Sequence, residues 1–150
     1  MTTLQKGDKA PAFSGIDQDG KTHTLADYKG KKLVVFFYPK ADTPGCTAEA
    51  CDLRDNYERF QANNYALLGV SADSAKAQSK FKNKYEFPFS LIADEDHAVI
   101  KAFGVWGPKK FMGREFDGIH RTTFVINENG IIDEVISKVE TKAHAAQILK

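Results

Sequence analysis

The sequence has few cysteines and no long apolar run, and these shortages exclude several classes of protein. Two cysteines among 150 residues are too few for a disulfide-stapled scaffold. With no histidine pair nearby they also make a poor zinc site, because structural zinc takes four ligands. No stretch approaches the roughly 20 apolar residues of a membrane span, and the first residues lack the apolar segment of a secretory signal. We therefore expect a cytoplasmic protein with no membrane partner, no metal and no cofactor.

The sequence also lacks an excess of charge, internal repeats and low-complexity segments. Its formal net charge is +1 and its pI is about 7.7, so we expect no nucleic acid as a partner. Two short basic clusters, at 29–32 and 109–110, are typical of solvated loops. The turn-like stretches are too short to be linkers, and residues 1–150 are predicted to form one domain with its own core.

Both cysteines lie in one segment, 38–51, which follows an apolar run and begins a predicted helix. Asp42 and Thr43 are both good N-cap residues, because their side-chain oxygens can accept from the free N–H groups of the first turn. Pro44 then suits the first helical position, where its missing N–H has no cost. Gly45 leaves the front of Cys46 uncovered. The residues before Cys46 thus predict a helix that begins at Pro44.

Cys46 is the third residue of this predicted helix, and that position favours a reactive thiol. The first turn of a helix offers unpaired N–H groups and the positive end of the helix dipole. Both favour the thiolate, which is the nucleophilic form of cysteine. In a reducing compartment, two closely spaced cysteines are more often catalytic or redox-sensing than structural. We therefore interpret Cys46 as a reactive cysteine and Cys51 as the thiol that traps its oxidised form.

Helix geometry separates the two thiols. The apolar positions after Cys46 lie on the same face as Cys46, which predicts that this face packs on the fold; they are Ala50, Leu53, Tyr57 and Phe60. Cys51 points about 140° away, and its Cα would lie about 8.5 Å from that of Cys46. A disulfide needs a Cα separation below about 7 Å, so the two cysteines could join only after the start of this helix unwinds.

Apolar patterning predicts alternating strands and helices along the whole chain. The predicted strands are Leu33–Tyr38, Tyr65–Ser71 and Phe89–Ile92, with a later hairpin of Arg121–Ile126 and Ile131–Val135. The predicted helices are the Cys46 helix, Ala75–Tyr85, Asp94–Phe103 and a final one from Lys142, with turn-like stretches at 15–20, 104–110 and 127–130. The pattern alone predicts an α/β fold with a central mixed β-sheet flanked by helices. Its order, a β-α-β unit followed by a hairpin and a closing helix, is that of a thioredoxin-like fold, and this specific name rests also on the resemblance described next.

The cysteine segment resembles the active-site loop of the peroxiredoxins. Pro39, Thr43 and Cys46 match the family's Pro-x-x-x-Thr-x-x-Cys signature, and Cys51 matches the second cysteine of the Q-type, or bacterioferritin-comigratory, branch. Arg121 matches the family's catalytic arginine. Three further segments are similar to the family's N-terminal and later blocks; they are Lys6–Phe13, Lys109–Gly113 and Asp117–Ile126. The peroxiredoxin resemblance implies the same thioredoxin-like fold.

The resemblance implies a thiol peroxidase that reduces hydrogen peroxide and organic hydroperoxides. Cys46 would attack the peroxide and become a sulfenic acid, with Thr43 and Arg121 orienting the peroxide and Pro39 shielding the site from water. Cys51 would then form an intramolecular disulfide, which thioredoxin or a similar dithiol protein would reduce. Because the resolving thiol lies in the same chain, a partner subunit is not needed and we expect a monomer.

Two other functions use the same cysteines. A disulfide oxidoreductase is one, although that function normally uses Cys-x-x-Cys, in which the sulfurs meet without unwinding. A non-enzymatic redox sensor that changes a partner surface on oxidation is the other. Each site residue also has a structural alternative. Cys46 as an inert buried thiol is disfavoured by its place in the first helical turn, whereas Cys51 could be an unreactive helical thiol and Thr43 only a helix cap. Arg121 alone would be a surface charge or ion-pair partner, so its catalytic role rests on the resemblance.

The remaining polar and aromatic residues are expected to be structural. His23, His97 and His144 are scattered and are predicted to be solvated, and His120 is predicted to be structural. Two roles are open to Trp106 and the pair 111–112, a border of the substrate pocket or loop packing, and of these we expect packing. We assign no role to Glu49.

Overall fold

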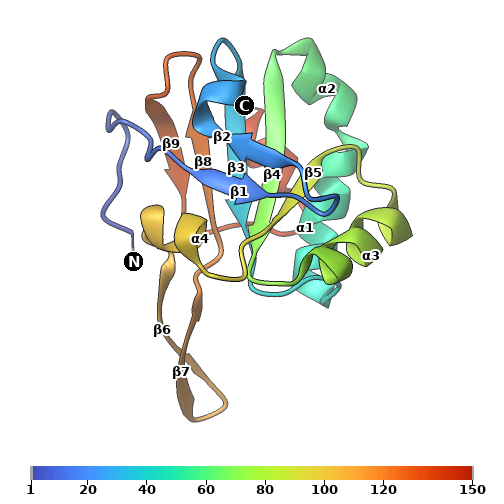
Figure 1. The fold of residues 1–150 in the computed structure, drawn as a ribbon, viewed down its shortest axis with the longest axis vertical. Coiled ribbons are helices and arrows are strands. Elements are labelled where there is room, and N and C mark those ends of the chain that lie inside the picture. Colours follow the sequence, from blue (N-terminus) through green and yellow to red (C-terminus); the bar gives the residue numbers. More distant parts are fainter. Residues whose placement is uncertain (1, 150) are drawn as a thin grey trace.

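The computed structural model describes residues 2–149 and contains the predicted alternation of strands and helices (Figure 1). The strands are β1 (Ser14–Ile16), β2 (Thr22–Thr24), β3 (Lys32–Phe37), β4 (Tyr65–Ser71), β5 (Ser90–Ala93), β6 (Trp106–Phe111), β7 (Arg114–Ile119), β8 (Thr122–Ile126) and β9 (Ile132–Ile136). The helices are the 3-10 helix η1 (Leu25–Tyr28), α1 (Pro44–Asp55), α2 (Tyr57–Ala62), α3 (Ala75–Tyr85), α4 (Ala98–Ala102) and α5 (His144–Ile148).

Five strands form the central sheet, in the order β5-β4-β3-β8-β9. β3 pairs in parallel with β4, and β4 with β5, whereas β8 and β9 run antiparallel to their neighbours. The parallel part arises because α1, α2 and α3 provide the crossovers, and the antiparallel part because a short turn joins β8 to β9. The predicted mixed α/β sheet is confirmed, with most strand limits within one or two residues of those predicted.

The sheet is covered on both faces, which explains why β3 is an apolar run without alternation. Leu33, Val35 and Phe37 face one apolar core, which α4 and the β1–β2 ribbon cover. Val34 and Phe36 face a second core, which the helices α1, α2, α3 and α5 cover; Cys46 belongs to this second core. Figure 1 shows the β1–β2 ribbon and α4 on the near side of the sheet.

The helix after Cys46 begins where predicted but is interrupted. α1 begins at Pro44 and ends at Asp55, and α2 follows after Asn56. The Asn56 side chain donates to the Asp52 carbonyl at 2.9 Å, and such local side-chain bonds compete with the helical pattern. Ala50, Leu53 and Phe60 are buried as expected, whereas Tyr57 is only half-buried.

Four other predicted limits differ from the structure. The final helix, predicted from Lys142, begins at His144. The helix predicted from Asp94 begins only at Ala98, because the Asp94 carboxylate accepts from the Val99 and Ile100 amides and thus lies before the first turn. The stretch 15–20, predicted as a turn, begins within the short strand β1, and only its later part forms the turn that leads to β2. The stretch 104–110, also predicted as a turn, contains most of β6.

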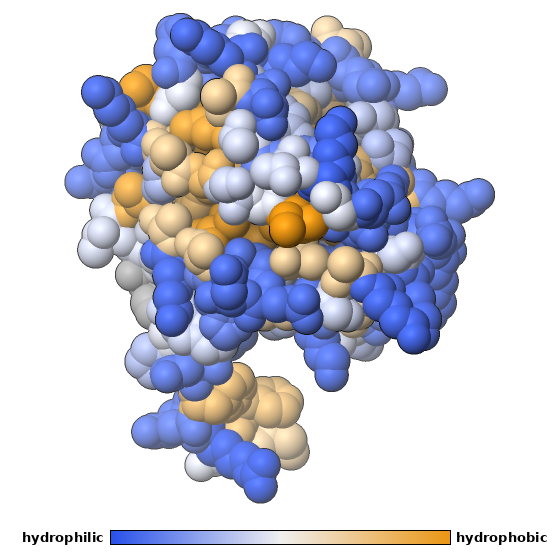
Figure 2. Space-filling view, viewed as in Figure 1, coloured by the Kyte–Doolittle hydropathy of each residue, from blue (hydrophilic) through white to orange (hydrophobic). Residues whose placement is uncertain are grey.

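β6 and β7 form a hairpin that projects from the body of the molecule (Figure 1). Its tip carries apolar side chains on the surface: Phe111 is 67% exposed and Met112 is 87% exposed. Figure 2 shows this apolar tip outside the main body. The prediction that this pair serves packing is therefore wrong, while Trp106 at the base does pack, with its ring centroid 4.1 Å from that of His97.

Among residues 2–149, the helices are all too short or too polar to cross a bilayer.

Candidate active site

Three elements meet at one end of the central sheet and bring the predicted site residues together. β3 ends at Phe37, and the chain continues through Pro39 into the first turn of α1. β8 runs antiparallel to β3, with Thr122 opposite Phe37 in the register. Because Arg121 directly precedes β8, the topology places it beside the start of α1 although the chain separates it widely from Cys46.

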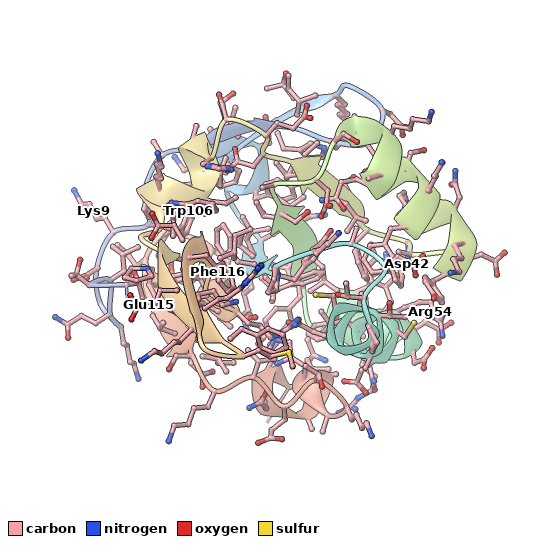
Figure 3. The ribbon with its side chains drawn as sticks, turned by 90° about the horizontal axis from the view of Figure 1, so that it is seen from below. Lys9, Asp42, Arg54, Trp106, Glu115 and Phe116 are labelled. Carbon is pink, nitrogen blue, oxygen red and sulfur yellow. The ribbon has the colours of Figure 1, made fainter. Side chains whose placement is uncertain are left out.

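The loop before α1 is held by several hydrogen bonds. The Ala41 amide donates to Asp73 Oδ2 at 2.8 Å. Asp42 has a positive φ of 58°, and its carboxylate accepts from Lys84 Nζ at 2.9 Å and from the Tyr85 hydroxyl at 3.0 Å. In Figure 3, Asp42 marks this loop and Arg54 marks the later part of α1. These contacts fix the path of the chain into the first turn of α1.

Cys46 is the third residue of α1 and is 2% exposed. Arg121 Nη2 donates to its sulfur at 3.3 Å. Gly45 allows this approach, because a Cβ at that position would lie 3.2 Å from Nη2, closer than most side-chain contacts. The space that the glycine leaves in front of the thiol is thus occupied by the guanidinium group.

Arg121 contacts a second side chain, which the sequence did not indicate. Its Nη1 donates to Glu49 Oε1 at 2.7 Å, so that one planar guanidinium bridges a thiol and a carboxyl group. Burial alone would lower the pKa of Arg121, but the electrostatic interactions and hydrogen bonds with Cys46 and Glu49 outweigh it and raise that pKa above its usual value. Arg121 therefore keeps its positive charge beside the sulfur.

Glu49 is the site residue that the sequence reasoning missed. It is fully buried on α1, one turn after Cys46, and burial raises its pKa to about 7 against the opposing charge of Arg121. The available signal was its position: Glu49 lies within the apolar stripe of α1, between Cys46 and Ala50. A carboxyl group on a buried helix face needs a partner, and here the partner is Arg121.

Thr43 occupies the predicted N-cap position but does not use its hydroxyl as a cap. Thr43 Oγ1 donates to the Lys40 carbonyl at 2.7 Å instead of accepting from the first turn of α1. The predicted capping role of its side chain is therefore wrong, and so is that of Asp42, whose carboxylate binds Lys84. Pro39 follows the end of β3 and is half-buried.

Cys51 lies further along α1 as a free, half-buried thiol. It packs against the same core as Cys46 from the edge. Burial raises the pKa of Cys51, with Arg54 opposing the shift. Because α1 is continuous from Pro44 to Asp55, the two thiols are held apart in this conformation, as helix geometry predicts.

The histidines depart from the prediction. His23 is buried and lies 2.7 Å from Asp17, and His144 is fully buried beside Glu49, so the prediction that they are solvated is wrong. His120 lies 3.0 Å from the Pro108 carbonyl at the base of the hairpin. Within residues 2–149, His, Cys, Asp and Glu side chains form no group of three or more that could hold a metal ion.

Comparison with known proteins identifies the family. Residues 6–135 match the model of the AhpC/TSA family. The chain is 47% identical over 149 residues to the putative peroxiredoxin bcp of Haemophilus influenzae, covering 99% of this chain and 96% of the relative. It is 46% identical over 149 residues to peroxiredoxin Bcp of Escherichia coli, with the same coverage.

Solved structures of related proteins have the same fold as this chain. A cysteine-to-serine variant of peroxiredoxin Q from Xylella fastidiosa has a TM-score of 0.92 and 32% identity, and the match covers 99% of this chain and 95% of that chain. The bacterioferritin comigratory protein of Xanthomonas campestris has a TM-score of 0.86 and 35% identity, covering 91% and 87%. The thioredoxin-like fold is thereby confirmed. The chain belongs to the AhpC/TSA family, and within it to the peroxiredoxins of the Bcp, or peroxiredoxin Q, type, which are thiol peroxidases.

Proposed function

We propose that Cys46 is the nucleophile of this thiol peroxidase and that Arg121 is its principal electrostatic partner. The observation that carries the proposal is the 3.3 Å contact between Arg121 Nη2 and the Cys46 sulfur in the first turn of α1. A fixed cation and the helix N-terminus both favour the thiolate, which is the form that attacks.

The attack needs few groups. The Cys46 thiolate forms a bond to one peroxide oxygen while the O–O bond breaks, giving a sulfenic acid and a hydroxide or alkoxide. Arg121 stabilises the negative charge that moves from sulfur to the departing oxygen. The Thr43 hydroxyl can turn from the Lys40 carbonyl to the peroxide, and Pro39 keeps water from the reacting sulfur.

Cys51 then attacks the sulfenic sulfur, forming a disulfide and releasing water. The two thiols lie in one continuous helix, so α1 unwinds at its start before this bond forms. A thioredoxin-type dithiol protein reduces the disulfide by exchange and is itself oxidised. Because both cysteines lie in one chain, we propose that the enzyme acts as a monomer.

We propose hydrogen peroxide and organic hydroperoxides as substrates. The structure of the Xanthomonas campestris relative is described in connection with alkyl peroxide reduction, which supports the organic class. We propose the cytoplasm as the location, because a reducing compartment supplies the dithiol protein that the catalytic cycle consumes.

Peroxide consumption with a thioredoxin recycling system tests the proposal. Wild type should turn over many peroxides per chain, Cys46→Ser should show none, and Cys51→Ser should react once and stop. A redox sensor would also react once in the wild type, so repeated turnover distinguishes the enzyme. Undiminished turnover by Cys46→Ser would remove Cys46 as the nucleophile.

A further inference from the structure

The two carboxyl oxygens of Glu49 have different surroundings. Oε1 accepts from Arg121 Nη1, whereas Oε2 is buried and has no hydrogen-bond partner within residues 2–149. Oε2 lies 3.5 Å from Nε2 of His144, the first residue of α5. A bare carboxylate oxygen in a dry interior is unfavourable, so the state of this pair needs a physical explanation.

The hydrogen bonds around His144 define its tautomer. The Gln147 amide nitrogen donates to the Lys138 carbonyl at 3.0 Å and its oxygen accepts from the Glu140 amide at 2.9 Å, which orients the amide. The same oxygen lies 2.7 Å from His144 Nδ1. Because an amide oxygen only accepts, Nδ1 carries a hydrogen. In the neutral ring Nε2 is then an acceptor, and Thr123 Oγ1 lies 2.7 Å from it.

Beside a neutral His144, an ionised Glu49 would therefore point an unpaired oxygen at the lone pair of Nε2. We propose that Glu49 is a protonated carboxylic acid in the reduced enzyme and that Oε2 donates its proton towards Nε2 of a neutral His144. Nε2 of His144 then accepts from both Thr123 Oγ1 and Glu49 Oε2. The buried oxygen of Glu49 thereby gains a partner for its proton. His144 is then a positioning residue that acts on the site through Glu49 and Arg121.

The consequence concerns the charge available to the thiolate, and here the inference rests on the proposed role of Cys46. With Glu49 neutral, the Cys46 thiolate alone balances Arg121. With Glu49 ionised, two buried anions would share one cation, and each would be less stable. With the proton on Glu49, the positive charge of Arg121 therefore stabilises only the Cys46 thiolate. The hydrogen bond from Arg121 Nη1 to Glu49 Oε1, which orients the guanidinium, is kept.

The surrounding charges agree with this placement of the proton. Burial raises the pKa of Glu49, and burial lowers the pKa of His144, so both directions favour a proton on the carboxyl group. Asp52 on α1 and Glu134 on β9 face His144 and raise its pKa, whereas Arg121 lowers it. Burial remains the largest of these effects on His144.

Infrared spectroscopy of the reduced protein tests the proposal directly. A Cys51→Ser background leaves a single thiol and prevents the disulfide. Near neutral pH we expect a carbonyl band of a buried protonated carboxylic acid, lost in Glu49→Gln and retained in Glu58→Gln, a matched change at an exposed position on α2. Absence of the band between about pH 5 and about pH 7 would overturn the proposal.

Replacing Cys46 gives a second test, because the Cys46 thiolate and Glu49 share the charge of Arg121. A purely structural role of Glu49 would leave the pH dependence of its acid band unchanged. In Cys46→Ser the thiolate is gone and Arg121 serves Glu49 alone, so the acid band should disappear at a pH lower by about one unit or more. An unmoved band would overturn the coupling. Neither readout involves peroxide, so failure of this inference is distinct from failure of Cys46 as the nucleophile.

Nitrogen NMR of the His144 ring completes the test. We expect one hydrogen, on Nδ1, and an unprotonated Nε2 in the reduced protein near neutral pH. Hydrogens on both nitrogens would mean that the proton resides on His144, which would overturn the placement on Glu49 while leaving the fold intact.

Discussion

Arg121 uses the two ends of a planar guanidinium at once, and this geometry distinguishes it from a simple positive charge. One end contacts the Cys46 sulfur at 3.3 Å and the other contacts Glu49 at 2.7 Å. A lysine ammonium is a compact charge without this fork and cannot reproduce both contacts in the same orientation. The position of the donor, and not only its charge, should therefore matter for the reaction.

We expect Arg121→Lys to lower the second-order rate of Cys46 oxidation by about 100-fold, because a directed donor to the departing oxygen is lost. Stopped-flow measurement of sulfenic acid formation gives this rate. Arg114→Lys, at an exposed position on β7, is the matched control and should keep the rate within about twofold. Equal rates for wild type and Arg121→Lys would contradict the assigned role.

Glu49 should make stability depend on pH. Its folded pKa of about 7 lies above the ordinary value of 4.5, so the folded state holds more protons than the unfolded state between these values. The free energy of unfolding should therefore fall as pH rises from about 4.5 to about 7, by about 1–3 kcal/mol. Urea unfolding at several pH values measures this slope, which Glu49→Gln should abolish and Glu58→Gln should retain.

Part of the site could be predicted from local sequence and part could not. The residues around Cys46 carry their own signals: Pro44 begins the helix and Gly45 leaves room before the thiol. Arg121 lies 75 residues from Cys46 in sequence, and only the family resemblance connected them. His144 gave no periodic signal, because its burial depends on how α5 packs against α1.

At the scale of elements, α1 combines two requirements that conflict. Its first turn must be formed to hold the Cys46 thiolate, and it must unwind for Cys51 to reach the sulfenic sulfur. α5 packs on the same helix, and the Ala145 amide donates to Asp52 Oδ2 at 2.7 Å. Unwinding of α1 should therefore weaken the attachment of α5.

We expect trypsin to cleave after Lys142, an exposed residue just before α5, about fivefold or more faster in the disulfide form than in the reduced form. Cleavage after Lys21, in the exposed turn between β1 and β2, is the internal control and should not change. Cys51→Ser treated with peroxide cannot form the disulfide and should stay protected at Lys142. Equal cleavage at Lys142 in both redox forms would contradict coupled unwinding.

The helices and strands were predicted well where the sequence pattern was long. They were predicted poorly where tertiary contacts determine the local structure. β4 and α3 were predicted with their observed limits, because β4 is a continuous apolar run and α3 has Phe81 and Tyr85 at helical spacing. The β6–β7 hairpin was missed because Gly107 and Pro108 lie within β6 and resemble a turn. Pro is tolerated there because the two-stranded hairpin leaves each strand with a free edge.

At the scale of the whole molecule, stability comes from two apolar cores on either side of one sheet, while the hairpin contributes little to them. Phe36 is fully buried in the core that also holds Cys46, and Met112 at the hairpin tip is 87% exposed. The two residues thus represent opposite environments in the same fold.

We expect Phe36→Ala to lower the free energy of unfolding by about 3–5 kcal/mol, because it removes a buried ring and leaves a cavity. Met112→Ala should change it by less than about 0.5 kcal/mol. Urea unfolding of the reduced proteins gives both values. A comparable loss in the two variants would mean that the hairpin tip packs on the body in solution.

Intact mass after one equivalent of peroxide, without any reductant, tests the central claim most directly. Wild type should lose two hydrogens as the Cys46–Cys51 disulfide forms. Cys51→Ser should instead gain one oxygen as the sulfenic acid, and Cys46→Ser should stay unmodified. A wild-type protein that gains oxygen and never loses two hydrogens would contradict Cys51 as the resolving thiol, and oxidation of Cys46→Ser at the wild-type rate would contradict Cys46 as the nucleophile.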